Sequence, residues 1–452
     1  MTSRLQTLAA SSGGRIFLAI LCCAALWPAY GYVALLIFGA IAVAATRPDR
    51  RPEVFSLLAI LIFLSQVIPQ SAAGGLGYKP LLFSAGWIAA VVAWSRIERL
   101  RRIGLLPLHL FVAIALAALA VLNTGGIRPV VSAMAWQQLA MALLWRTSYW
   151  MKWRAKSGRE APIVSRLFAL IPCFGSGGVP IGKSPEYFER YEARKPQALA
   201  EAHVEGAKLL LLALIYRLIL IGLDRTLWNP TPDTTFFDLQ ALIPPMNELM
   251  ADPAQFAVYA RWIGLCGELV RAILELAVFG HTAVGICCWM GYKIPRNTRS
   301  PLWSNSIFDF WTRYYFYFKE LLLDFFFFPV YLKLKRFSPV TRTVVATFAA
   351  ACAGNFYYHA LLYASPLMQL PGNLDGYLQW IGARAIYCVV LATGLSFSMI
   401  RTVKNPQLQR RRWLGIMVSA AFFALLHIWS YGAEPFTIAA RWRVFASLFG
   451  IG

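Results

Sequence analysis

One histidine of this chain has neighbours that suit general-base chemistry. His359 lies in the segment GNFYYHALLY, where Gly354, Asn355 and two tyrosines precede it. The amide and phenol groups can hydrogen-bond or stack around a ligand. A low-dielectric environment favours a neutral imidazole near pH 7, and a neutral imidazole can accept a proton from a hydroxyl. On these residues alone His359 is a candidate general base, and a packed, hydrogen-bonded structural histidine is the alternative.

The other four histidines have simpler interpretations as structural residues. His203 lies in the polar segment AEAHVEGAK and is expected on a solvated helix. His109 and His427 stand alone within apolar segments, where a packed and hydrogen-bonded histidine is more common than a catalyst. His281 is also interpreted as a structural residue.

A series of glycine, proline and aromatic positions precedes His359 over residues 279–331. Their order and spacing resemble the bacterial branch of the membrane-bound O-acyltransferase family, in which a Gly-x-Trp-His signature follows. In this chain Gly354 and His359 stand at that signature, with Tyr358 in place of its tryptophan. The positions that carry the resemblance are Gly280, Thr282, Gly285, Gly291, Pro295, Asn297, Pro301, Phe310, Trp311, Asp324, Phe325 and Pro329.

An earlier segment, IPCFGSGGVPIGKSPEYFERY, is similar to a loop of the same family. Gly178, Pro180, Ile181 and Phe188 stand at the matching places. The resemblance covers residues from about 165 to about 430, whereas the first 150 residues contain apolar segments without a recognisable motif.

The resemblance implies an acyl-CoA-dependent O-acyltransferase with His359 and Tyr315 as its catalytic residues. Family members commonly place His, Asn or Asp where this chain has Tyr315, whose phenol can hydrogen-bond a thioester but cannot act as a neutral base at pH 7. Acyl-CoA is then a co-substrate, and neither a tightly bound cofactor nor a metal is expected. The substrate-binding residues that the resemblance implies are Asn355, Tyr358, Trp311, Arg313, Asn297 and Lys319.

The acceptor implied by the resemblance is a hydroxyl on an extracytoplasmic or lipid-linked molecule, with a cell-envelope glycan as the first expectation. A periplasmic partner protein is compatible with this reaction. Two other functions stay open on the residues alone. One is a non-catalytic transporter or channel, although the chain lacks the internal repeat of many transporters. The other is a membrane scaffold that works with a partner acyltransferase.

The composition of the chain is that of an integral membrane protein. Hydrophobic residues make up 58% and charged residues only 14% of the sequence, against roughly 25% charged residues in soluble domains. The net charge of +22 comes from clusters of Lys and Arg between apolar segments. That distribution is typical of cytoplasmic loops and of contact with anionic lipids, and it excludes a nucleic-acid-binding surface. A multi-pass membrane protein is predicted, and the resemblance to the bacterial branch of the family implies the bacterial inner membrane.

Apolar segments that are long enough, or nearly long enough, to cross a bilayer recur along the chain, judged against the roughly 20 residues that a span needs. The first and seventh of them are long enough for two helices each, broken near Trp27-Pro28 and Gly280. We therefore predict about ten to twelve transmembrane helices. The segments are 16–45, 54–70, 79–95, 103–123, 129–150, 206–223, 254–290, 340–364, 378–400 and 413–431.

The predicted fold is thus an all-α polytopic membrane protein with re-entrant or interfacial helices, and the resemblance implies that they surround a central tunnel. The segment 308–334 is assigned to such a buried or interfacial helix, because it carries five charges among its aromatic residues. Three regions are expected: N-terminal transmembrane helices over 1–160, an acyltransferase-like core over 161–431 and a C-terminal helix over 432–452. The acidic segment 224–253 is placed on the outer side.

Overall fold

The computed structural model is almost entirely helical, which confirms the all-α prediction. The strands β1 (Gly175–Ser176) and β2 (Val179–Pro180) pair as one short antiparallel hairpin. The structure describes residues 9, 11–31, 33–46, 48–73, 78–97, 109, 112, 127–157, 163–171, 175–176, 179–228, 243–367, 373–404, 412–432 and 436–451.

The helices occupy nearly all the apolar segments that the sequence marks. Their bounds are α2 (Ser12–Tyr30), α3 (Val33–Thr46), α4 (Arg51–Ala73), α5 (Lys79–Arg96), α8 (Ile127–Ser157), α9 (Pro185–Arg190), α10 (Pro196–Leu223), α12 (Met246–Ala251), α13 (Val258–Trp289), α14 (Ile307–Tyr314), α15 (Phe316–Leu322), α16 (Phe328–Lys333), α17 (Pro339–Thr347), α18 (Asn355–Leu367), α19 (Asn373–Lys404), α20 (Arg412–Ser430) and α21 (Ile438–Ser447). Short 3₁₀ turns are η1 (Pro48–Arg50), η2 (Val164–Ala169), η5 (Pro253–Gln255) and η6 (Pro301–Trp303), and π-helical turns are η3 (Asp224–Trp228), η7 (Leu323–Phe327) and η8 (Phe348–Gly354).

Within the described part of the chain, four helices are long and apolar enough to cross a membrane. They are Pro196–Trp228, Val258–Trp289, Asp375–Arg401 and Trp413–Ser430. Their length and composition support the prediction of a multi-pass membrane protein. The predicted span 103–123 lies outside the described residues apart from two single positions, so the expected total of about ten to twelve helices stays a prediction.

The two predicted helix breaks have different outcomes. The first long segment does form two helices, but Trp27 and Pro28 lie inside α2, and the break is at Gly31, where a positive φ of 51° ends α2. The break predicted at Gly280 is wrong, because α13 continues through it for 32 residues. A single glycine inside a helix costs only about 1 kcal/mol, which the apolar packing of a long helix can offset.

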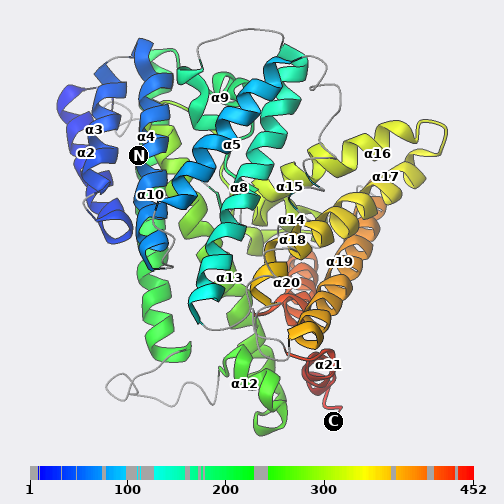
Figure 1. Ribbon diagram of the computed structural model, residues 1–452. Coiled ribbons are helices and arrows are strands. Elements are labelled where there is room, and N and C mark those ends of the chain that lie inside the picture. The colour runs from blue at the N-terminus through cyan, green and yellow to red at the C-terminus, as the bar shows by residue number, and fades with distance from the viewer. Residues whose placement is uncertain are drawn as a thin grey trace. The chain divides into compact units, whose positions relative to one another are not determined.

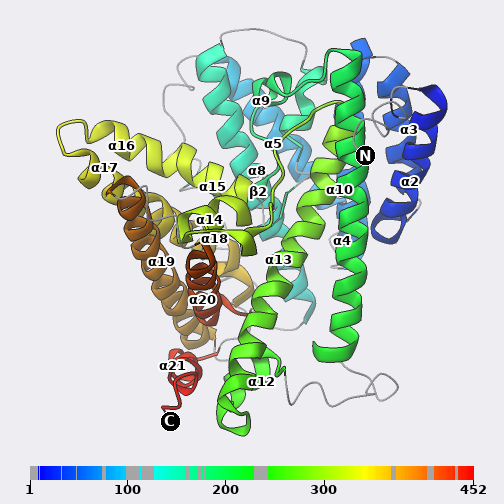
Figure 2. The ribbon, with the colours of Figure 1, turned by 180° about the vertical axis from the view of Figure 1, so that it is seen from behind.

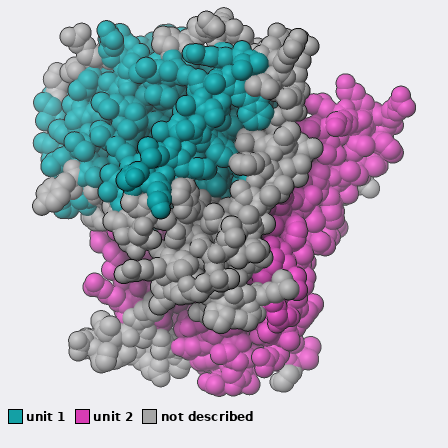
Figure 3. All heavy atoms as spheres, in the orientation of Figure 1, with its two compact units in different colours: residues 1–215, 278–296 teal, residues 216–277, 297–452 magenta. Residues whose placement is uncertain are grey.

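The chain forms two compact units, coloured separately in Figure 3, and each is described by itself. Unit 1 comprises residues 1–215 and 278–296. In this unit α2, α3 and α4 lie side by side, as the blue helices of Figure 1 show. Its aromatic core joins Phe55 of α4 to Phe168, with ring centroids 4.7 Å apart, and to Phe188, with centroids 5.6 Å apart.

The parts of α10 and α13 that belong to unit 1 approach each other closely at two glycines. A Cβ added at Gly206 would lie 2.7 Å from Cδ1 of Trp289 and 2.9 Å from the carbonyl oxygen of Gly285. The same contact buries His203, whose ring stacks on Trp289 with centroids 4.6 Å apart. His203 is 1% exposed, so the expectation of a solvated His203 is wrong: this face of α10 packs against α13.

Unit 2 comprises residues 216–277 and 297–452. Residues 339–367 form one continuous helical segment through α17, η8 and α18, which packs against α19 (Figure 2). The segment 308–334 is broken at Tyr315 rather than forming one straight span: α14 ends there, and α15, η7 and α16 continue as one helical segment over 316–333. In the outer loop predicted over 224–253, the structure shows η3, α12 and the first residue of η5, and residues 229–242 lie outside the described part.

Candidate active site

The chain breaks its helical path at Tyr315, between α14 and α15. Tyr315 has an extended conformation, with φ −137° and ψ 79°. The break leaves backbone N–H groups at the start of α15 that need acceptors. Asn297 supplies an acceptor for two of these N–H groups. Its carbonyl oxygen accepts from the N–H of Phe316 at 2.9 Å, and its Oδ1 accepts from the N–H of Tyr317 at 3.3 Å.

Hydrogen bonds hold both ends of α14, the helix that precedes the break at Tyr315. Ser306 caps the start of α14, because its Oγ accepts from the N–H of Asp309 at 3.1 Å. At the other end the Thr298 hydroxyl donates to the carbonyl oxygen of Tyr314 at 3.1 Å. Asn297 thus belongs to the segment that orders this break, and the structure gives its backbone and its Oδ1 a structural role.

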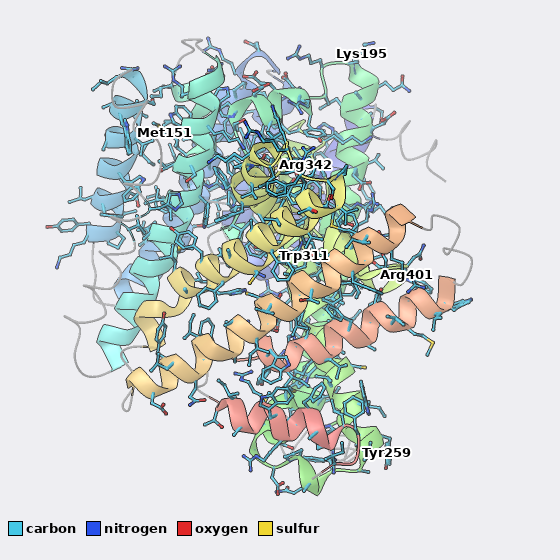
Figure 4. All side chains as sticks on the ribbon, turned by 90° about the vertical axis from the view of Figure 1, so that its right-hand side faces the viewer. Met151, Lys195, Tyr259, Trp311, Arg342 and Arg401 are labelled. Atoms are coloured by element: carbon cyan, nitrogen blue, oxygen red, sulfur yellow. The ribbon has the colours of Figure 1, made fainter. Side chains whose placement is uncertain are left out.

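Phe318 joins four of the residues that the sequence singles out. Its ring centroid lies 6.1 Å from that of Trp311 and 5.5 Å from that of Tyr315. It also lies 4.6 Å from Tyr358 and 6.5 Å from His359. Trp311 is buried, and Figure 4 shows its side chain among those of the helical bundle. The helices α14, α15 and α18 therefore bring these four aromatic rings around one phenylalanine.

Two π-helical turns, η7 and η8, meet directly before Asn355. A Cβ added at Gly354, the last residue of η8, would lie 2.6 Å from Cγ of Phe326 in η7. Only glycine admits the Phe326 ring at this distance, because carbon atoms in contact normally lie about 3.5–4.0 Å apart. The close approach of η7 thus fixes the position at which α18 begins.

Asn355 is fully buried, and neither Oδ1 nor Nδ2 has a hydrogen-bond partner among the described residues. Leaving a buried amide without partners costs roughly 1–3 kcal/mol for each polar group. Asn355 and His359 lie four residues apart in α18, on the same helix face. An amide that can accept a ligand therefore stands beside the candidate base.

His359 is half-buried and lies against residues of two other helices. Its ring meets Tyr387 of α19 edge to face, with centroids 6.0 Å apart and planes at 88°. The charge of Arg384, one turn earlier in α19, acts on both His359 and His427. The Arg384 guanidinium lies over the ring of Trp380, 4.7 Å from its centroid.

The two cations predicted to bind substrate have carboxylate partners within their own helices. Nε of Arg313 lies 2.7 Å from Oδ1 of Asp309, one turn earlier. Nζ of Lys319 lies 2.6 Å from Oε1 of Glu320 and sits over the ring of Phe316, 4.5 Å from its centroid. These ion pairs give both cations a structural role in α14 and α15.

Sequence reasoning missed Phe318, Tyr387 and Arg384. Arg384 carried a usable signal, because an ionisable residue within an apolar span marks a functional site by default. Tyr387 lies one helical turn beyond it and shares its face. Phe318 carried none, since it is one of many aromatic residues in the segment 308–334.

The remaining isolated histidines have structural partners. Nε2 of His109 lies 3.1 Å from the Ser148 hydroxyl, and Nδ1 of His427 lies 3.4 Å from the Ser430 hydroxyl. In the part of the chain that the structure covers, no group of three or more His, Cys, Asp and Glu residues is arranged to hold a metal ion.

Comparison with known proteins finds no protein-family model that matches the chain, and no curated protein that matches it significantly. The resemblance to membrane-bound O-acyltransferases therefore rests on the residues quoted above.

Proposed function

We propose that this protein is a membrane-embedded O-acyltransferase of the bacterial inner membrane. It transfers an acyl group from cytoplasmic acyl-CoA to a hydroxyl of an extracytoplasmic or lipid-linked acceptor, of which a cell-envelope glycan is the first candidate. The observation that carries the proposal is the position of His359 one helical turn from Asn355, on one face of α18, where the buried Asn355 amide makes no hydrogen bond of ordinary geometry to the described residues. The sequence resemblance supplies the reaction.

In the proposed reaction His359 accepts the proton of the acceptor hydroxyl. The alkoxide oxygen attacks the thioester carbonyl, a C–O bond forms, and the carbonyl oxygen becomes negatively charged. When the tetrahedral intermediate collapses, the C–S bond breaks and the CoA thiolate leaves with the electron pair. The proton on His359 then neutralises the thiolate, which restores the imidazole.

Asn355 supplies the group that this reaction needs at the carbonyl oxygen. Its Nδ2 donates to the developing oxyanion, and removal of one such donor typically costs about 3 kcal/mol in the barrier. Tyr315 and Tyr358, which flank Phe318 with His359, orient the donor. The broken segment 308–334 serves as the re-entrant wall of a tunnel in which donor and acceptor meet from opposite faces.

The test uses membranes that contain the protein, radiolabelled acetyl-CoA and isolated envelope material. We expect label in the envelope fraction with the wild type, none above background with His359→Gln, and about a hundredfold lower rate with Asn355→Ala. His109→Gln is the matched control, because it changes a histidine whose partner is a structural serine, and it should transfer label at the wild-type rate.

Three results would contradict the proposal. One is equal transfer by His359→Gln and by the wild type, with both proteins folded and inserted. Another is transport of a solute that continues unchanged in His359→Gln, which would favour a transporter. The third is transfer that needs a second protein and survives His359→Gln, which would favour the scaffold function.

A further inference from the structure

Tyr387 of α19 lies beside both chemistry-bearing residues of α18, His359 and Asn355. Its ring meets the His359 imidazole edge to face, at 6.0 Å and 88°. This arrangement of aromatic rings is attractive and disfavours rotation of either ring out of its plane. Since α18 packs along α19, the contact is part of the interface between two helices.

The Tyr387 hydroxyl lies beside the Asn355 amide. The contact does not have the geometry of an ordinary hydrogen bond, since both polar atoms of the amide lack such a partner among the described residues. The Tyr387 side chain of α19 and the Asn355 side chain of α18 thus meet at this amide.

An asparagine amide can present either of two faces to a ligand. Its oxygen accepts hydrogen bonds and its NH₂ group donates them, and a flip of 180° exchanges the two. Only the NH₂ group can stabilise a carbonyl oxygen that becomes negative. A hydroxyl that donates to Oδ1 selects the orientation in which Nδ2 points away from it, toward a substrate.

We propose that Tyr387 is a positioning residue of the candidate active site. Its ring fixes the plane of the His359 imidazole, and its hydroxyl donates to Oδ1 of Asn355 when substrate binds, which turns Nδ2 toward the thioester oxygen. This inference rests on the proposed acyl transfer and adds to it a residue outside the sequence motif. It also assigns separate tasks to the ring and to the hydroxyl of one side chain.

The two tasks are separated by Tyr387→Phe, which removes only the hydroxyl, and Tyr387→Leu, which also removes the ring. Tyr377→Phe is the matched control, because it makes the same change ten residues earlier in the same helix. We expect Tyr387→Phe to lower kcat about tenfold to a hundredfold with the KM for acetyl-CoA unchanged. The combined variant Tyr387→Phe with Asn355→Ala should be no slower than Asn355→Ala alone, since the hydroxyl acts through that amide.

A wild-type kcat in Tyr387→Phe, or multiplied losses in the combined variant, would overturn the inference. The contact with His359 has a readout that needs no activity, namely the melting temperatures of Tyr387→Leu, His359→Leu and their combination in detergent. Losses that do not add support the contact, whereas additive losses contradict it. Coupled melting with no transfer by the wild type would refute the proposed function and retain the contact.

Discussion

The substitution Gly354→Ala tests whether the meeting of η7 and η8 determines where the candidate site forms. The added Cβ would lie 2.6 Å, 2.7 Å and 3.0 Å from Cγ, Cδ2 and Cδ1 of Phe326. Carbon atoms in contact normally lie about 3.5–4.0 Å apart, so each distance is short by about half an ångström or more. The Phe326 ring cannot yield at its far end, because the atoms concerned are those next to its own Cβ.

The magnitude follows from two opposing effects. Inserting a methyl group into a packed site costs about 1–3 kcal/mol. Replacing glycine by alanine within a helix returns up to about 1 kcal/mol. With the cost at the middle of its range, about 2 kcal/mol, and a return of about 1 kcal/mol, the expected net loss of unfolding free energy is about 1 kcal/mol. Asn355 follows directly in sequence, so displacement of the backbone should also lower the acyl-transfer rate.

The assay is thermal unfolding of the purified protein in detergent, compared with Gly222→Ala. A Cβ at Gly222 meets no atom within 4 Å, and this residue lies within α10, so the control should be neutral or slightly stabilising. Gly354→Ala should melt a few degrees lower than both the wild type and the control. If Gly354→Ala melts together with Gly222→Ala, the packing argument is refuted.

Three further outcomes follow from contacts within the two units. Gly206→Ala should destabilise the protein more than Gly222→Ala, because its Cβ would lie 2.9 Å from the Gly285 carbonyl oxygen and force two helix backbones apart; thermal unfolding measures the difference. Arg441 is fully buried and donates to the carbonyl oxygens of Ile428 and Tyr431, and burial lowers its pKa to about 10, which leaves it charged at neutral pH. Arg441→Met should therefore cost about 2–4 kcal/mol, seen as loss of folded protein in size-exclusion chromatography, and full recovery of folded protein would contradict this. Asp309→Asn should lower the free energy of unfolding by only about 0.5 kcal/mol, since both partners of the ion pair between Asp309 and Arg313 are 28% exposed. A large drop in melting temperature would contradict this and show that the pair does more than join one helical turn.

The sequence allowed the helical class and most helix positions to be predicted, because long apolar segments leave few alternatives in a membrane. It did not reveal which glycines interrupt a helix. Gly31 ends α2, whereas Gly280 lies inside a continuous α13. The difference depends on what packs against each glycine, and that information is spread over distant residues.

The candidate site could be predicted only in part, again because the contacts that form it come from residues far apart in the sequence. Tyr315, Tyr358 and Trp311 meet His359 at a shared ring, yet that ring, Phe318, had no distinguishing pattern. The charges of Arg313 and Lys319 indicated substrate binding, but their acidic neighbours in sequence are also their neighbours in space. For charged residues within one turn of a carboxylate, an ion pair should be considered before a ligand.

The π-helical turn η8 determines the direction in which Asn355 and His359 point from α18. A π turn inserts residues relative to an α-helix, and each inserted residue rotates all that follows by about 100° about the helix axis. Asn355 begins α18 directly after η8, so the rotation acts on Asn355 and His359 together and preserves their spacing. With a regular α-helix over 348–354, the two side chains would turn away from Tyr387 while α17 kept its place. The less regular backbone is thus the feature that aims the amide and the imidazole at the same residue of α19.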